Sequence, residues 1–197
     1  MQFHLLLVAL FALAPVLDGV LGTDEWSGPA VRRESMEGGG EVWLRRDGDR
    51  LFVAVKSLKR GIASLCTGNK DDVEILHASA ALGTARFHRE GKEWKPMRSF
   101  SWTTRADATA EERAAHMASA GWLANASTAP NLVREFEIRL QPGRELVGVA
   151  FLHTDEPQSV AYWPKSMRDD CAAIDLAQGY VHEKMRFDPR KWSKARQ

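Results

Sequence analysis

The clearest pattern of apolar and polar positions lies in residues 41–57, where two short apolar runs flank Asp47-Gly48-Asp49. Asp and Gly tolerate the backbone angles of a tight turn, and the Val, Trp, Leu and Phe residues on either side suit a pleated surface. The pattern predicts a β-hairpin whose strands pack on both faces. Because two strands alone are only marginally stable in water, the rest of the chain must supply more sheet and a second layer.

Further segments have the composition of strands. Segment 133–140 alternates apolar and charged residues, which is typical of a strand with one dry and one wet face, and 145–152 is nearly all apolar, which indicates burial on both faces. Lys59-Arg60-Gly61 predicts a turn after the first hairpin, followed by a short edge segment at 62–66. The other expected strands are 73–77, a second hairpin of 84–89 and 93–97, an extension at 100–104, then 160–163 and 179–187.

One helix is predicted between these strands. Thr109 is a favourable N-cap residue, Glu112 completes a capping box three residues later, and Gly121 stands where a helix would end. Its apolar stripe is thin, mostly Ala with Met117, so we expect a surface helix over one end of the sheet. Short strands without alternating long helices predict an all-β fold, a jelly-roll-like antiparallel β-sandwich with one inserted surface helix.

The N-terminus has the pattern of a secretory signal peptide, with an apolar block at residues 5–14 and small residues before a possible cut after Gly22. We expect residues 1–22 to be removed, residues 23–40 to form a flexible lead-in rich in Gly, Ser and charge, and residues 41–197 to form one domain. The alternative is an uncleaved N-terminal anchor, although the apolar block is shorter than the ~20 residues of a spanning helix. Cleavage would make the protein secreted or periplasmic.

Charge and hydropathy argue against two classes of partner. Removal of residues 1–22 takes away one acidic residue, so the formal charge of the mature chain is 27 minus 25, or +2. This balance gives no basis for nucleic-acid binding, which needs a basic excess on one face. No stretch after the signal is apolar enough to span a membrane, so we expect no integral membrane segment after cleavage.

Cys66 and Cys171 are the two cysteines, and both lie in the part expected to be exported. An even number of cysteines in an oxidising compartment predicts one disulfide, which would close a loop of about 105 residues and stabilise the fold by about 4 to 5 kcal/mol. The alternative is a pair of buried free thiols.

The first hairpin, an apolar strand with an aromatic residue, a short Asp/Gly turn and then Leu-Phe-Val-Ala-Val, resembles the opening of family 9 carbohydrate-binding modules and of the related DOMON-like sandwiches. The similarity covers most of residues 41–187 as a pattern and implies a non-catalytic module that binds a sugar or, in some DOMON relatives, a haem. The sequence departs from the family at the third strand. Asp71 and Asp72 are followed there by His77-Ala78 rather than by an acidic run, so the resemblance supplies no calcium site.

The chain contains seven Trp, several of them at expected strand ends or loops. An indole presents a large flat surface on which the C–H groups of a sugar face can stack. We therefore expect a carbohydrate, or another small polar ligand, to bind at an aromatic-lined site without a cofactor. The candidate ligand-binding residues are Trp94, Trp102, Trp122, Trp163 and His77. The alternative is that these side chains belong to the core or rim of the sandwich.

Two other functions stay open. His77 and His153 each end an expected buried strand, so they could bind a metal together with Asp155 or Glu156. As in a DOMON-like redox module, His77, His153 or a methionine such as Met97 or Met117 could instead bind a haem. The favoured interpretation is that both histidines are buried and hydrogen-bonded within the protein. The sequence has no Gly-x-Ser-x-Gly, His-Glu-x-x-His, phosphate-binding loop or Cys-x-x-Cys motif. We therefore expect no catalytic residues, with a secreted hydrolase whose residues go unrecognised as the remaining alternative.

Overall fold

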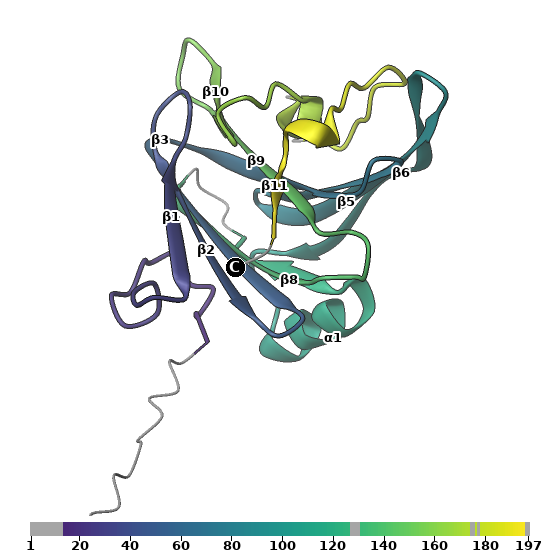
Figure 1. Cartoon of the computed structure of the whole chain (residues 1–197). Helices are drawn as coiled ribbons and strands as arrows, with labels where there is room; N and C mark the ends of the chain where they lie inside the picture. The colour runs from purple at the N-terminus through teal and green to yellow at the C-terminus, as the bar shows by residue number, and fades with distance from the viewer. Residues whose placement is uncertain (1–13, 127–130, 174–175, 177, 196–197) are drawn as a thin grey trace, which may run out of the picture.

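The computed structural model describes residues 14–126, 131–173, 176 and 178–195. Antiparallel strands form its framework, and the described residues include one α-helix, α1 (Ala110–Ala120) (Figure 1). The strands are β1 (Val31–Ser35), β2 (Glu41–Asp47), β3 (Arg50–Gly68), β4 (Asp72–Ala78), β5 (Ala81–Glu90), β6 (Glu93–Arg105), β7 (Trp122–Ala124), β8 (Asn131–Arg139), β9 (Leu146–His153), β10 (Ser159–Trp163) and β11 (Ser193–Lys194). The chain also contains the short 3-10 helices η1 (Asp170–Ala172) and η3 (Pro189–Lys191).

Strand β3 organises the fold because its 19 residues belong to both layers. Its first half pairs with β2 on one side and β8 on the other, and its second half pairs with β4 and β9. The register with β8 shifts between Lys56 and Gly61, where the strand passes from one layer to the next. The predicted turn at Lys59-Arg60-Gly61 and the separate edge segment at 62–66 are therefore wrong: β3 continues through these polar residues, and distant strands pair with it on either side of them, up to Lys56 and from Gly61 onward.

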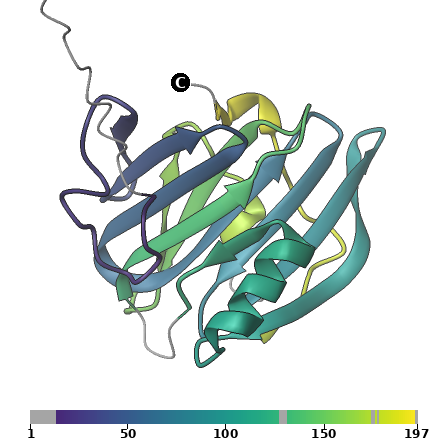
Figure 2. The same ribbon diagram turned by 90° about the horizontal axis from the view of Figure 1, so that it is seen from below.

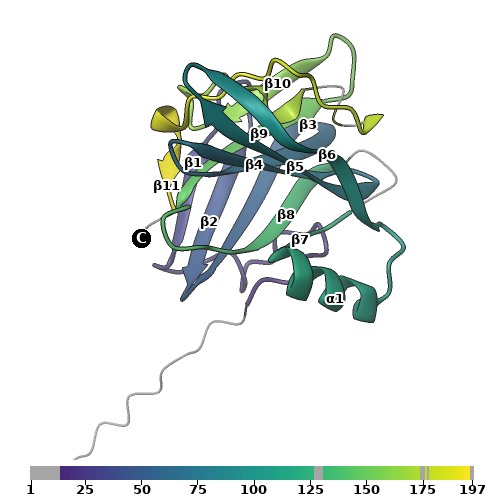
Figure 3. The same cartoon turned by 90° about the vertical axis from the view of Figure 1, so that its right-hand side faces the viewer.

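The strands form two layers, which Figure 3 shows one above the other. We call sheet I the set β1, β2, the first half of β3, β8 and β7, and sheet II the set β6, β5, β4, the second half of β3, β9, β10 and β11. The main core lies between them and includes Val53 and Phe136 from sheet I with Leu65 and Phe151 from sheet II. The all-β sandwich with one inserted helix is thus confirmed.

Local signals in the sequence locate several elements correctly. Asp47 pairs with Arg50 across a two-residue turn in the first hairpin, and Glu90 pairs with Glu93 in the second. The helix begins after Thr109, and both reciprocal bonds of its capping box are present. It ends at Gly121, whose left-handed conformation (φ 75°) suits a residue without a side chain. The helix lies across one end of the sandwich (Figure 2).

The N-terminal boundary of the domain differs from the prediction of a flexible lead-in at residues 23–40. Val31 to Ser35 form β1, paired along its whole length with β2. Before it, Trp26 is buried against Trp43 and Phe52 on the outer face of sheet I. The Gly-rich composition of this region hid these contacts, because an edge strand with mixed polar residues has no apolar periodicity to reveal it.

The C-terminal segment covers the outer face of sheet II (yellow in Figure 1). Met185, Phe187 and Trp192 are buried there in a second apolar cluster with Ile75 and Phe87 of sheet II. The predicted strand at 179–187 is wrong. Backbone amides of this segment donate hydrogen bonds to aspartate side chains rather than to a neighbouring strand. A carboxylate oxygen of Asp170 accepts the Arg186 amide at 2.8 Å, and one of Asp169 accepts the Asp188 amide at 2.9 Å.

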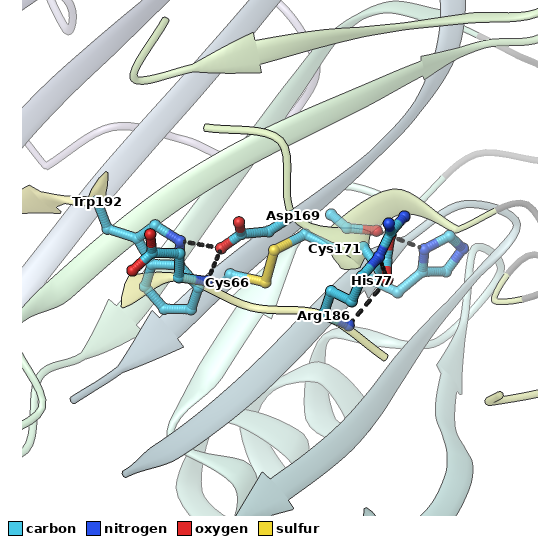
Figure 4. Close-up of a disulfide and its surroundings, with 9 residues drawn as sticks. Cys66, His77, Asp169, Cys171, Arg186 and Trp192 are labelled. Carbon is cyan, nitrogen blue, oxygen red and sulfur yellow. Dashed lines mark hydrogen bonds and ion pairs between the residues drawn. A yellow bond between two sulfur atoms is a disulfide. The ribbon is translucent and has the colours of Figure 1, made fainter. Parts of the chain in front are cut away.

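A disulfide joins Cys66 of β3 to Cys171 of η1, as the sequence predicted (Figure 4). Beside it, the Trp192 indole N–H donates to the buried Asp169 carboxylate. The segment is thus attached to sheet II by one covalent bond and several polar contacts. Among the described residues, no helix is both long and apolar enough to cross a membrane.

Candidate functional site

Three of the four candidate Trp residues lie inside the molecule. Trp94, Trp122 and Trp163 are only 6%, 1% and 1% exposed. Each indole N–H has an internal acceptor: the Phe187 carbonyl for Trp94, the Thr84 hydroxyl for Trp122 and the Glu34 carboxylate for Trp163. These three side chains come from different parts of the sandwich and are not brought together. In this structure none of them offers a ring face to a ligand.

Trp102 is different, because 42% of it is exposed. The remaining three Trp residues, Trp26, Trp43 and Trp192, are all less than a tenth exposed. Trp102 is therefore the one Trp of the seven with a surface available for stacking.

The position of Trp102 depends on irregular pairing at the edge of sheet II. It pairs with Gly83 of β5, next to a register shift in the β5–β6 ladder. Because Gly83 has no side chain, the Phe100 ring lies directly over its backbone. The Phe100 and Trp102 rings then meet edge to face, with centroids 4.8 Å apart and an interplanar angle of 75°. The backbone of Gly179, in the C-terminal segment, approaches the indole nitrogen of Trp102.

His77 supports Trp102 from within the sheet. The two rings are edge to face at 5.9 Å, so these two predicted site residues do lie together. His77 is buried, its Nδ1 is 2.8 Å from the Ser64 hydroxyl, and its Nε2 is buried with no partner among the described residues. Burial, with a smaller effect from the charge of Arg134, lowers the pKa of His77 to about 4. His77 is therefore neutral at neutral pH and acts here as a packing partner of Trp102.

A groove of about 1040 Å³ begins at Trp102 and runs between the end of β6 and α1. Its lining on the β6 side includes Thr103, Thr104 and Arg105, and on the helix side Glu112 and His116. Hydroxyl, guanidinium, carboxylate and imidazole groups therefore line a groove whose rim carries an exposed aromatic ring.

The polar groups of the groove differ in how strongly they are already bound. Arg105 and Asp107 form an exposed ion pair at 3.4 Å, which leaves both accessible to a ligand. One oxygen of Glu112 accepts the Thr109 amide in the capping box at 2.7 Å. His116 is buried, and its Nε2 has no hydrogen-bond partner among the described residues. Burial, and then the charge of Arg113, lowers the pKa of His116.

The geometry does not bring His77 and His153 together as metal ligands. In β4, His77 alternates with the inward-facing Leu76 and Ala78, so its ring lies on the outer face of sheet II, whereas His153 follows Phe151 on the inner face. Both ring nitrogens of His153 are within 2.9 Å of Ser hydroxyls. In the described part of the chain, no three His, Cys, Asp or Glu residues are grouped to hold a metal ion.

Reasoning from the sequence missed the contribution of the helix to this groove. The capping box that identified α1 also placed Glu112 and His116 on known positions of one helix, but nothing local indicated which strand this helix would face. Comparison of the chain with protein-family models, with curated proteins and with solved structures gave no match.

Proposed function

We propose that the protein is an exported, non-catalytic module that binds carbohydrate in the groove between β6 and α1. The observation that carries this proposal is the exposed Trp102 ring at the rim of a groove lined by polar side chains. Sugars present C–H faces and hydroxyl edges at once, so a binding site needs a flat apolar surface beside hydrogen-bonding groups.

Each part of the groove has a role in this proposal. One sugar ring stacks on Trp102. The edge-to-face contacts of Trp102 with the His77 and Phe100 rings hold its orientation. The Arg105 guanidinium and the Asp107 carboxylate bind hydroxyl groups of the same or the next ring, because both are exposed and carry surplus donors or acceptors. The open shape of the groove suits a chain of sugar units rather than a single enclosed one.

Two independent features support export and the class of module. The Cys66–Cys171 disulfide is of the kind that persists in oxidising compartments, and the N-terminal sequence has the pattern of a signal peptide. The resemblance of the first hairpin to family 9 carbohydrate-binding modules points to the same ligand class.

Intrinsic fluorescence tests the proposal, because six of the seven Trp residues are buried and Trp102 is the one placed to respond. The protein is titrated with oligosaccharides of β-glucan, xylan, mannan and chitin. We expect a saturable change with at least one of them, and we expect calorimetry, which does not depend on the Trp102 signal, to show that binding of this sugar is lost in Trp102→Ala. Met97→Ala is the matched control, since Met97 is an exposed residue of the same strand that lies outside the groove.

The outcome separates the alternatives clearly. An oligosaccharide response that persists unchanged in Trp102→Ala would place the site elsewhere. If the unmodified protein shows no fluorescence change with any of these oligosaccharides and calorimetry detects no binding heat, carbohydrate is not its ligand.

A further inference from the structure

A second cavity lies at the C-terminal end of α1, next to the groove, with which it shares Ser119 and Ala120 in its lining. Its volume is about 240 Å³. The apolar part of its wall comes from the main core and includes Leu76 of sheet II with Trp122 and Ile138 of sheet I. The cavity therefore borders the main core of the sandwich.

Charged side chains also line this cavity. Glu74 is buried on the inner face of β4, where one of its oxygens accepts a hydrogen bond from Arg86 Nε at 2.8 Å and the other lies 3.9 Å from Arg144 Nη1. Arg139 also borders the cavity, and its nearest acidic group, Asp49, is 4.0 Å away. Among the described lining residues, one carboxylate thus stands against three guanidinium groups.

Of the three guanidinium groups that line the cavity, that of Arg144 has a buried nitrogen without a hydrogen-bond partner in the described part of the chain. Its Nε is buried without a partner among the described residues, and its contact with Glu74 is longer than a hydrogen bond. Its side chain keeps 22% exposure, so part of it remains open to a ligand in the cavity. A buried donor without an acceptor costs free energy, and an anionic oxygen beside this group would recover that cost.

We propose that this cavity binds a small organic monoanion, a carboxylate bearing a short apolar group. The carboxylate pairs with Arg144 and Arg139, and the apolar group packs on Leu76 and Trp122. A ligand with one negative charge fits better than one with two, because the Glu74 carboxylate already neutralises part of the positive charge of the arginines and would repel a dianion. The volume is below the range of about 300 to 1,000 Å³ that is usual for drug-sized ligands, so the apolar group must be short.

Calorimetric titration with sodium hexanoate tests this site, with hexanamide as the uncharged analogue of the same shape. We expect saturable binding of hexanoate that is at least about tenfold weaker for hexanamide and in Arg144→Met. Arg98→Met is the control, since Arg98 is an exposed cation on β6 outside the cavity. Equal binding of hexanoate and hexanamide, or full binding by Arg144→Met, would overturn the proposal, as would the absence of binding at millimolar concentration.

Two Ala residues of α1 keep this test independent of the carbohydrate proposal and of the folding of Arg144→Met. Ala118 is exposed and lines the cavity but not the groove, whereas Ala115 is exposed and lines the groove but not the cavity. We expect Ala118→Trp to abolish hexanoate binding and to leave the oligosaccharide response intact, with the reverse for Ala115→Trp. Retention of hexanoate binding by Ala118→Trp would overturn the cavity site whether or not the groove binds sugar.

Discussion

Cys66 and Cys171 are 105 residues apart in the sequence, yet their Cα atoms lie 5.9 Å apart across the disulfide that joins β3 to η1. Both residues are fully buried in the apolar cluster between sheet II and the C-terminal segment. The bond therefore closes most of the sandwich into one loop and holds the covering segment in place.

Replacement of both cysteines by alanine is expected to lower the free energy of unfolding by about 4 to 5 kcal/mol, because the unfolded chain regains the freedom of a long loop. Urea denaturation of the variant and of the reduced unmodified protein measures the loss. The two samples are expected to agree, since alanine removes little buried volume. A midpoint that does not move on reduction would show that the bond adds nothing to stability.

Two buried groups are expected to give opposite pH dependences. The pKa of His77 is lowered to about 4 by burial, so stability is lost as the pH falls from 6.5 towards 4 and the unfolded chain takes up the proton. In the chain that retains residues 14–22, the pKa of Glu135 is raised to about 7, chiefly by burial and against the hydrogen bonds from Gly19 and Trp26. Its contribution is therefore fully present below pH 4.5 and is lost as the pH rises towards 7.

Since each of these pKa changes corresponds to roughly 3 kcal/mol, we expect the two to cancel largely between pH 4.5 and 6.5. Glu135→Gln should expose the His77 effect, so that stability rises with pH across this window. His77→Gln should expose the Glu135 effect, so that stability falls with pH. Denaturation midpoints at several pH values measure both slopes, and two variants with the same sign of slope would contradict this assignment.

Gly61 is expected to be essential where β3 changes sheets. A Cβ atom at this position would overlap the Leu152 carbonyl of the neighbouring strand and the Phe151 ring. We therefore expect Gly61→Ala to cost on the order of 3 kcal/mol or more, because a backbone atom cannot move aside easily. Gly91→Ala, at a left-handed turn position with open space around it, should cost only about 1 kcal/mol. Equal losses in the two variants would contradict the proposed close packing.

The sequence was most informative where a structural feature depends on neighbouring residues. Thr109, Glu112 and Gly121 define α1 through contacts within a few residues of each other, and the Asp47-Gly48 turn fixes the first hairpin in the same way. Strand β3 is the opposite case. Whether Gly61 turns or continues depends on β8 and β9, which lie more than 60 residues away in the chain.

The candidate site shows the same division. The sequence offered Trp102 and His77 as candidates, but it could not separate Trp102 from Trp94, since Trp94 is covered by Phe187 of the distant C-terminal segment. Exposure of an aromatic ring is a property of the tertiary structure. The groove likewise needed the placement of α1 against β6, for which the helix sequence carries no signal.

Arg134 provides the most direct test of the sandwich interior. It faces inward from β8, opposite Val55, and is fully buried. Its Nε, Nη1 and Nη2 have no hydrogen-bond partner among the described residues, and burial lowers its pKa to about 10. An uncompensated buried charge opposes folding, because the guanidinium loses its hydration without gaining a partner.

Replacement of Arg134 by methionine keeps a long unbranched side chain and removes the charge. We expect the free energy of unfolding to rise by roughly 1 to 4 kcal/mol, in the range seen when buried charges are replaced by apolar groups of similar size. Arg98→Met, at an exposed position, should change stability by less than about 0.5 kcal/mol. Urea denaturation compares the two variants with the unmodified protein. A loss of several kcal/mol in Arg134→Met would mean that the guanidinium is paired in solution, and the interior would then contain a polar network rather than an isolated cation.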